Sequence, residues 1–260
     1  MADIRGKHVL VTGASSGIGF QIAAEALRRG AIVTAAARRT EPMQALHPLG
    51  KTQVIQSDLT DTRAAQILVN AATATFGPVD ILVNNAGAQL VEDFAACDPA
   101  QGEKTLMLNV FTPLRLSRAV LPTMIERKDG VIIDIASLAA LAPTPGMLYY
   151  NAGKAAIAAA SESMRGELRG TGVHVLTVYP GPVTTPLAEA AYAKYEETRA
   201  MKMMPEGKPD ELARLIWDAV IKRKNRIVYP ASYQTARWFP AITRAALDRF
   251  TPKRRELPSP

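Results

Sequence analysis

The sequence predicts an α/β fold in which one doubly wound parallel sheet of about seven strands has helices on both faces. Three observations lead to this prediction. Short apolar runs alternate with helical patterns along nearly the whole chain. These runs are rich in β-branched residues and almost continuously apolar, which is typical of strands buried on both faces. A glycine-rich turn separates the first run from the first helical pattern, as is common in doubly wound folds.

Seven runs are predicted as strands, and the patterns between them as helices. The strands cover residues 8–12, 31–37, 52–58, 80–87, 130–137, 173–180 and 226–230. The helices cover residues 18–29, a short stretch near Met43, and residues 63–76, 104–127, 148–170 and 210–222. With 260 residues, the chain is long enough for one large domain and short for two. We therefore assign residues 1–230 to a single Rossmann-like domain and residues 231–260 to a basic C-terminal helical extension of it.

The composition is that of a soluble globular protein, with 48% apolar and 21% charged residues. No apolar stretch reaches the roughly 18–20 residues that span a bilayer, and the N-terminal residues do not resemble an export signal. The single cysteine, Cys97, excludes a disulfide within the chain. We expect a cytoplasmic protein, and we expect no metal site.

The net charge of +7 is concentrated near the C-terminus, where residues 222–260 hold ten Lys and Arg residues against two acids. A basic protein suggests nucleic acid as a partner. Binding of single strands would call for aromatic residues interleaved with the basic ones, and only Trp238 and Phe239 come near that pattern. We therefore expect no nucleic-acid partner.

Residues 233–250 predict a further helix, because apolar residues recur there at three- and four-residue spacing. This stripe comprises Phe239, Ile242, Ala246 and Phe250. Burial against the protein's own core, the substrate entrance or a neighbouring subunit would explain the stripe. The basic residues after it, with Trp238 at its edge, also fit peripheral contact with an anionic membrane. Both alternatives stay open.

The turn after the first predicted strand reads Gly13-Ala-Ser-Ser-Gly-Ile-Gly19. Glycines at a strand-to-helix turn let the backbone approach a pyrophosphate closely, and the helix that follows offers free N–H groups and a positive dipole. The pattern predicts a dinucleotide site. Its expected contacts are Gly13, Ser15, Ser16, Gly17, Ile18 and Gly19.

The end of the second predicted strand indicates which dinucleotide binds. Ala37-Arg38-Arg39 stands where NAD-dependent dehydrogenases place an acid for the ribose 2′-hydroxyl. A guanidinium forms charge-assisted hydrogen bonds with a 2′-phosphate, which a carboxylate would repel. We assign Arg38 to the 2′-phosphate of NADP(H), with Arg39 as a helper or a bystander.

Tyr150 and Lys154 are four positions apart on a predicted helix, so both project from one face. A free phenol has a pKa near 10, too high for an efficient base at neutral pH, and a nearby ammonium lowers it. Ser137, at the end of the fifth predicted strand, can donate a hydrogen bond to a substrate oxygen. Tyr149 has glycine at the fourth following position, so packing or a pocket wall suits it better.

These motifs together resemble the short-chain dehydrogenase/reductase family. The matching residues are Thr12 to Gly19, Asn84 to Gly87, Asn109, Ser137, Tyr150 to Lys154 and Pro180 to Thr185, in the family's order from residue 7 to about 190. The chain departs from the family's commonest motifs in three places. It has Asp134-Ile-Ala-Ser137 where Asn-Ile-Ser-Ser is frequent, and YNAGK where YSASK is frequent. The region after Thr185 has no family signature.

The resemblance implies further site residues. Asn109 would hold a water that extends the proton path from Lys154, and Lys154 would reach the nicotinamide ribose. Further implied cofactor contacts are Asp58 and Leu59 at the adenine, Asn85, Ala86 and Gly87 beside the ribose, and Pro180, Gly181, Val183 and Thr185 at the carboxamide. For Asp58, a role in capping a turn is a competing interpretation.

We expect an oxidoreductase that moves a hydride between NADP(H) and a carbonyl or alcohol substrate, most readily by reducing an apolar ketone or aldehyde. A catalytically silent NADP(H)-binding sensor or partner-binding module is the alternative. Residues 187–204 are apolar and rich in methionine, which fits either a lid over the substrate or a helix packed on the core. The Tyr150 helix carries small residues on more than one face, and the resembling family commonly pairs this helix across a two-fold axis, so we expect a homodimer or homotetramer. Close packing of these residues on the chain's own sheet is the alternative.

Overall fold

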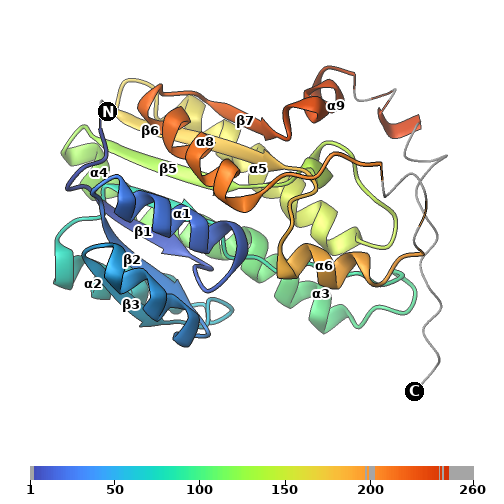
Figure 1. The fold of residues 1–260 in the computed structure, drawn as a ribbon, viewed down its shortest axis with the longest axis horizontal. Coiled ribbons are helices and arrows are strands. Elements are labelled where there is room, and N and C mark those ends of the chain that lie inside the picture. The colour runs from blue at the N-terminus through green and yellow to red at the C-terminus, as the bar shows by residue number, and fades with distance from the viewer. Residues whose placement is uncertain (1–2, 197, 199–202, 240, 242, 246–260) are drawn as a thin grey trace.

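The computed structural model describes residues 3–196, 198, 203–239, 241 and 243–245. Its sheet has seven strands, all parallel, in the order β3-β2-β1-β4-β5-β6-β7 (Figure 1). The strands are β1 His8–Thr12, β2 Ile32–Ala37, β3 Thr52–Gln56, β4 Ile81–Asn84, β5 Gly130–Ile135, β6 Val173–Pro180 and β7 Arg226–Tyr229. The predicted doubly wound sheet is confirmed.

Helices cover both faces of the sheet (Figure 1). On one face lie α1 Gly17–Arg28, α8 Pro209–Ile221 and the 3₁₀ segment Glu41–Leu49. On the other lie α2 Ala64–Phe76, α4 Thr112–Glu126 and α5 Leu148–Glu167. The strands divide between these layers by alternation: Val9 and Val11 join the first core, whereas Leu10 joins the second. Because both faces of a strand are buried in this way, its residues must be apolar at nearly every position, as they are in the sequence.

The strand order reverses between β1 and β4, which creates a crevice at their carboxyl ends. After β1 the chain continues to α1 on one face of the sheet, and after β4 it continues to α3 and to α4 on the other face. The motifs singled out in the sequence follow these strand ends. The fold thus gathers them along one edge of the sheet.

The helix predicted over residues 104–127 differs in the structure. It consists of α3 Pro99–Leu106, a π-helical turn Met107–Phe111 and α4, without a break between them. Pro99 follows the capping residue Asp98, whose side chain accepts a hydrogen bond from the Ala100 amide at 3.0 Å and begins the helix early. A π turn leaves no mark in the apolar periodicity, so the sequence does not predict it.

The predicted C-terminal helix is described only in part. Helix α9 spans Gln234–Trp238 and follows a short 3₁₀ segment, Ala231–Tyr233. Of the predicted stripe, Phe239 is described and exposed, whereas Ile242, Ala246 and Phe250 lie outside the described residues. In the part of the chain that the structure describes, no helix has the length and apolarity needed to cross a membrane.

Candidate active site

The glycine turn connects β1 to α1 with two residues in the left-handed region, Gly13 at φ +66° and Gly17 at φ +56°. A Cβ on Gly13 would lie 2.8 Å from the Ala86 Cα. On Gly19 it would lie 2.5 Å from the Gly13 carbonyl oxygen. Gly13 and Gly19 therefore allow close backbone packing, and the turn cannot form with larger residues there.

Thr12 fastens this turn to the end of β4. Its hydroxyl donates to the Val83 carbonyl at 3.0 Å and accepts from the amides of Asn85 and Ala86, each at 3.1 Å. The Asn85 side-chain amide donates back to the carbonyls of Thr12 and Gly13 at 3.0 and 3.2 Å. Asn85 thus supports the turn from its side chain, and only its backbone faces the crevice with Ala86 and Gly87.

The N-terminus of α1 fits a phosphate. Ser16 precedes the helix in an extended conformation, but its side chain makes no capping hydrogen bond, and the first turn contains no acid. The free amides and the positive end of the helix dipole therefore remain available to an anion. Ser15, Ser16 and Ile18 are partly exposed at this point. These features fit a dinucleotide pyrophosphate, as the sequence predicts.

Arg38 and Arg39 follow β2 and are both exposed. Asp58 accepts hydrogen bonds from the Thr60 amide at 3.0 Å and the Thr60 hydroxyl at 2.8 Å, which lower the pKa of its carboxyl. The charge of Arg38 lowers that pKa further, so Asp58 and Arg38 lie near each other. Asp58 thus caps a turn and also stands at the predicted adenine end. Its neighbour Leu59 is buried.

Ser137, Tyr150 and Lys154 come together where β5 ends and α5 begins. The Ser137 hydroxyl lies near the Tyr150 phenol, whose pKa is raised by burial and held down by this serine. The same hydroxyl accepts from the Ala139 amide at 3.1 Å and donates to the Pro180 carbonyl at 3.4 Å. The Lys154 ammonium lies 5.9 Å from the centroid of the Tyr150 ring. The three side chains predicted from the sequence thus form one cluster.

Lys154 is the electrostatic centre of this cluster. Its side chain is only 6% exposed, and its Nζ donates to the Ile135 carbonyl at 2.7 Å. Burial lowers the pKa of Lys154 to about 8, and the carboxylate of Asp134 opposes this shift. A lysine with this pKa is close to losing its proton at physiological pH, so its charge depends on its surroundings.

Asn109 lies on the π-helical turn and is almost fully buried. Its Oδ1 accepts from the Ala88 amide and its Nδ2 donates to the Ala88 carbonyl, each at 2.9 Å. A Cβ on Gly87 would lie 3.0 Å from the Asn109 Oδ1 and 3.4 Å from the Lys154 Nζ. Asn109 and Lys154 therefore meet at Gly87, the glycine of the Asn84–Gly87 motif. A π turn inside a helix often marks a functional site.

The segment after β6 lies beside the glycine turn. A Cβ on Gly17 would be 3.1 Å from the Thr185 Cγ2. The Thr185 hydroxyl accepts from the Ala188 amide at 3.2 Å and caps α6, Pro186–Tyr192. Val183 is buried and pairs with Gly207, while the Gly181 amide donates to the Tyr229 carbonyl at 2.7 Å. With Pro180, these residues form the wall that the resemblance places at the carboxamide.

Helix α6 and its neighbours border the other side of the cluster. Ala191 and Tyr195 are buried against Val91 and Met147, with Tyr150 packed beside them. Along this border, large apolar side chains remain exposed: Phe94, Leu148, Leu187, Met203 and Met204. Met201, the other methionine of this segment, lies outside the described residues. The inner side of the segment therefore packs as one alternative predicts, its outer side stays apolar and exposed, and the lid role stays a prediction.

Two tyrosines near the cluster act differently. Tyr149 packs over Gly102, where a Cβ would overlap its ring, and it contacts Phe94 at 6.2 Å between ring centroids. Tyr192 faces the catalytic side: burial raises its pKa to about 12, and the charges of Glu206, Tyr233 and Tyr150 add to that rise. Tyr149 is a packing residue here, and Tyr192 belongs to the segment of residues 187–204 for which the sequence suggests a lid or a packed helix.

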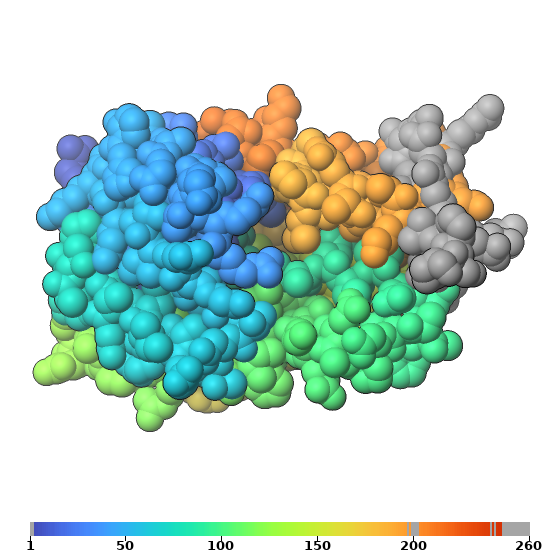
Figure 2. Space-filling view, turned by 90° about the horizontal axis from the view of Figure 1, so that it is seen from below, coloured from blue at the N-terminus to red at the C-terminus, as the bar shows by residue number. Residues whose placement is uncertain are grey.

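Viewed from below, the surface is hollowed where the blue N-terminal segments meet orange α6 and the green segments after β4 (Figure 2). Within the described residues, no three His, Cys, Asp or Glu side chains gather closely enough to hold a metal ion. The arrangement offers a phosphate site on one side, an acid–base group in the centre and an apolar border on the other side.

The family model for short chain dehydrogenases matches residues 7–196. The chain belongs to this family. It is therefore an oxidoreductase that acts on carbonyl or alcohol groups with a nicotinamide dinucleotide. Solved structures agree with this: a short-chain dehydrogenase from Streptomyces avermitilis has a TM-score of 0.80 and 30% identity, covering 94% of this chain and 96% of that one.

Relatives with assigned names include two reductases of acyl compounds. A fatty acyl-CoA reductase of Mycobacterium tuberculosis is 37% identical over 193 residues, which cover 71% of this chain and 66% of that protein. The chain thus matches slightly less than two thirds of that relative's length. A fatty acyl-CoA reductase of Acinetobacter baylyi is 35% identical over 234 residues, covering 86% of this chain and 76% of the relative.

The burial of Lys154 leads to a prediction about stability. Between the lowered pKa of about 8 and the ordinary value of 10.5, the folded protein has released a proton that the unfolded chain still binds. Stability therefore rises with pH in this range, by about 3 kcal/mol if the full shift is expressed. We expect the wild type to gain this much relative to Lys154→Met between these pH values, as measured by urea unfolding.

The matched control is Lys104→Met, which replaces an exposed lysine on α3. Its difference from the wild type is expected to stay flat over the same pH range. If the Lys154→Met difference stayed equally flat, the lysine would not be buried in the way described.

Proposed function

We propose that this protein reduces an apolar ketone or aldehyde with NADPH, and that Tyr150 supplies the proton. The observation that carries the proposal is the cluster of Ser137, Tyr150 and Lys154 beside a helix N-terminus that is free to bind phosphate. An intact cluster of this kind argues against the silent sensor, because a protein that only binds the dinucleotide has no need of a proton donor.

The preference for NADPH rests on the end of β2. Arg38 is exposed there, its charge reaches the Asp58 carboxylate, and the preceding Ala37 offers no acid. When bound, NADPH supplies the hydride that is transferred to the carbonyl carbon. Residues 180–185 would hold its nicotinamide end, and the glycine turn would hold its pyrophosphate.

The chain's own residues then handle the proton and the developing charge. The Ser137 hydroxyl would donate to the carbonyl oxygen and stabilise its negative charge, while Tyr150 protonates that oxygen. The Lys154 ammonium favours the phenolate that remains on Tyr150. Asn109 holds the backbone of Ala88 next to Lys154 and would place the water from which the proton is restored.

The apolar character of the substrate is supported by the exposed side chains that border the cluster, including Leu148, Leu187 and Met204. Apolar surface of this extent beside a polar reaction centre suits a ligand with an apolar body and one carbonyl. Two relatives are named as fatty acyl-CoA reductases, and a further one, from Nostoc, as a ketoacyl reductase. Acyl carbonyl compounds are therefore the first substrates to test.

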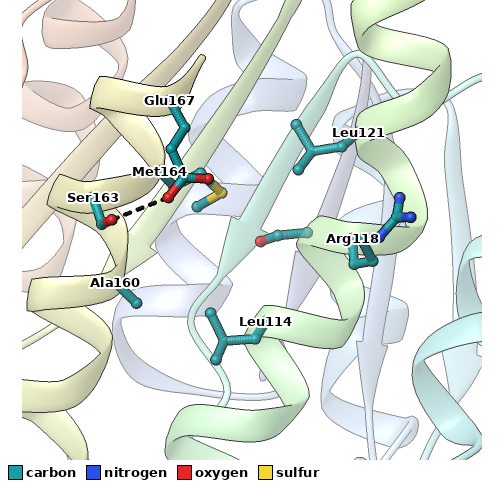
Figure 3. A pocket seen from close by; sticks show the side chains of 8 residues that line it. Leu114, Arg118, Leu121, Ala160, Ser163, Met164 and Glu167 are labelled. Carbon is teal, nitrogen blue, oxygen red and sulfur yellow. Dashed lines mark hydrogen bonds between the residues drawn. The ribbon is translucent and has the colours of Figure 1, made fainter.

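We also propose that the protein forms a homodimer or homotetramer through α4 and α5. A groove between these helices is lined by Leu114, Leu121, Ala160 and Met164, with Arg118 on one wall and Glu167 on the other (Figure 3). Exposed alanines continue along α5 next to it, at positions 155, 156 and 159. A second copy related by a two-fold axis would bury this apolar groove. Cytoplasmic location and membrane contact of the C-terminal residues stay predictions.

Replacing Tyr150 by phenylalanine removes the proton donor and leaves the packing intact. We expect Tyr150→Phe to fold and bind NADPH but to lose about 10²–10⁴-fold in kcat, the usual contribution of general acid catalysis. The measurement is steady-state NADPH oxidation with a panel of apolar ketones, aldehydes and acyl thioesters. Tyr149→Phe is the matched control and keeps its activity. If Tyr149→Phe lost its activity and Tyr150→Phe kept it, the assignment of Tyr150 as the proton donor would be wrong.

Arg38→Ala tests the choice of dinucleotide. Charge-assisted hydrogen bonds contribute about 1.5–3 kcal/mol, so we expect NADPH affinity to fall by about 10- to 100-fold while NADH affinity stays the same. Dissociation constants measured at one ionic strength by the fluorescence of the reduced nicotinamide compare both cofactors. Arg39→Ala is the control and has the smaller effect. An Arg38→Ala protein with undiminished NADPH affinity would contradict the assignment.

The groove between α4 and α5 gives a prediction about assembly. Light scattering at micromolar concentration is expected to show at least twice the chain mass of 28.0 kDa. Ala160→Arg places a long charged side chain in the groove and is expected to yield monomers. Ala74→Arg, on the exposed side of α2, keeps the assembly. A wild-type protein that is monomeric would exclude this interface.

A further inference from the structure

Asp134 is the most deeply buried carboxyl group near the active site. It lies on β5, three residues before Ser137, and its side chain has no exposed surface. Its Oδ1 accepts from the Asn84 Nδ2 at 2.8 Å, and the Ser161 hydroxyl also lies close to the carboxyl group. The other oxygen, Oδ2, has no hydrogen-bond partner among the described residues. A carboxylate with this few partners needs compensating positive charge nearby.

That charge comes from the face of α5 that lies on the sheet. Lys154, Ser161 and Arg165 fall on one stripe of the helix, at spacings of seven and four residues. Lys154 is held by the carbonyl of Ile135, the residue next to Asp134. Arg165 is held on β6, where its Nε donates to the Val175 carbonyl at 2.9 Å. Burial raises the pKa of Asp134, and both cations oppose this rise by favouring the ionised form.

The other elements packed around Asp134 bring no further titratable group to it. From β4 comes the Asn84 amide, which also donates to the Ser117 hydroxyl of α4 at 3.1 Å. From β6 comes the Thr177 hydroxyl, which is hydrogen-bonded to Ser161 at 2.8 Å. Around Lys154, Asp134 is the titratable side chain whose charge bears on it, and the Tyr150 ring lies 5.9 Å from its ammonium. Asp134 is thus the one described acid that acts on the Lys154 charge.

We propose that Asp134 is a positioning residue whose carboxylate serves as the buried counter-ion of Lys154 and keeps this lysine protonated during the reaction. Burial works against the lysine charge, and the Ile135 carbonyl alone supplies only a dipole. A negative charge on the adjacent residue restores the ammonium that Tyr150 needs. The inference rests on the proposed function, in which Lys154 supports the Tyr150 phenol.

The opposing possibility is that Asp134 is a neutral polar residue that only joins β4 to α5. Asp134→Asn separates the two, because it keeps the shape and removes the charge. Its carbonyl oxygen can accept from the Asn84 Nδ2, and its amide can donate to the Asn84 Oδ1, which otherwise has no partner among the described residues. The variant is therefore expected to fold and to bind NADPH as the wild type does.

The first test is the pH dependence of kcat for carbonyl reduction. Without the carboxylate, the Lys154 ammonium is less stable and loses its proton at lower pH. We expect the alkaline limb of the profile to move down by about one pH unit in Asp134→Asn. Ser161→Ala, which removes a neighbouring hydroxyl without changing any charge, is the control and keeps the limb in place. An unmoved limb in Asp134→Asn overturns the proposal.

The second test does not depend on turnover. The ultraviolet absorbance of the Tyr150 phenolate, isolated by subtracting the titration of Tyr150→Phe, is expected to develop at higher pH in Asp134→Asn than in the wild type, because a neutral Lys154 no longer stabilises the phenolate. An unchanged phenol titration overturns the proposal even if activity changes. If no carbonyl is reduced by the wild type, the proposed function fails, and this titration still decides the role of Asp134.

A third measurement uses only the wild type, so it decides the question even if Asp134→Asn does not fold. Carboxyl ¹³C NMR of the wild type, with Asp134 assigned, is expected to show a carboxylate at neutral pH. A protonated Asp134 at neutral pH overturns the proposal, because a neutral acid cannot act as a counter-ion.

Discussion

The Thr12 hydroxyl joins the two strand ends between which the site is built. By donating to Val83 on β4 and accepting from the amides of Asn85 and Ala86, it fixes the exit of β1 against the exit of β4. The chain diverges to opposite faces of the sheet at this point, and the Asn85 side chain adds two hydrogen bonds to the carbonyls of Thr12 and Gly13. The glycine turn, the Asn84–Gly87 motif and, through Gly87, the positions of Asn109 and Lys154 all depend on this contact. A small polar side chain suits it, because it must both donate and accept within a buried strand end.

A second constraint is the conflict between burial and charge on α5. Packing this helix on β5 and β6 places Lys154 and Arg165 against the sheet, where charged groups are costly. The same packing fixes the lysine four residues from Tyr150 on a rigid element, so no side-chain ordering is required during the reaction. Burial also moves the pKa of Lys154 to about 8, which makes its charge sensitive to one nearby carboxyl. The burial of Lys154 therefore both lowers the stability of the fold and makes the charge of this lysine sensitive to its surroundings.

Most of the fold could be predicted because the alternation of apolar strands and helices is regular. The number and places of the seven strands follow from it, and the cofactor turn follows from glycines that tolerate positive φ. Other features have no local signal. The π turn at Asn109 depends on how α3 and α4 meet, and the role of the Asn85 side chain depends on a strand that is distant in sequence. Asp134 was visible as a departure from the family's usual asparagine, but its burial between Asn84 and α5 required the tertiary structure.

The residues proposed for proton transfer are buried and hydrogen-bonded, whereas those proposed to contact the substrate are largely exposed. The groups proposed to move the proton lie just after β5, on α5 and on the π turn, and are held by hydrogen bonds to the backbone in the core. The groups proposed to select the substrate lie on the short helix α6 and on neighbouring loops, where Leu187 and Met203 make little contact with the core. A substitution on the substrate side therefore changes few interactions that the reaction depends on, whereas one near Lys154 alters packing, charge and acid–base behaviour together. Such a division lets the same reaction serve different carbonyl compounds, since the apolar border can vary while the buried cluster stays fixed.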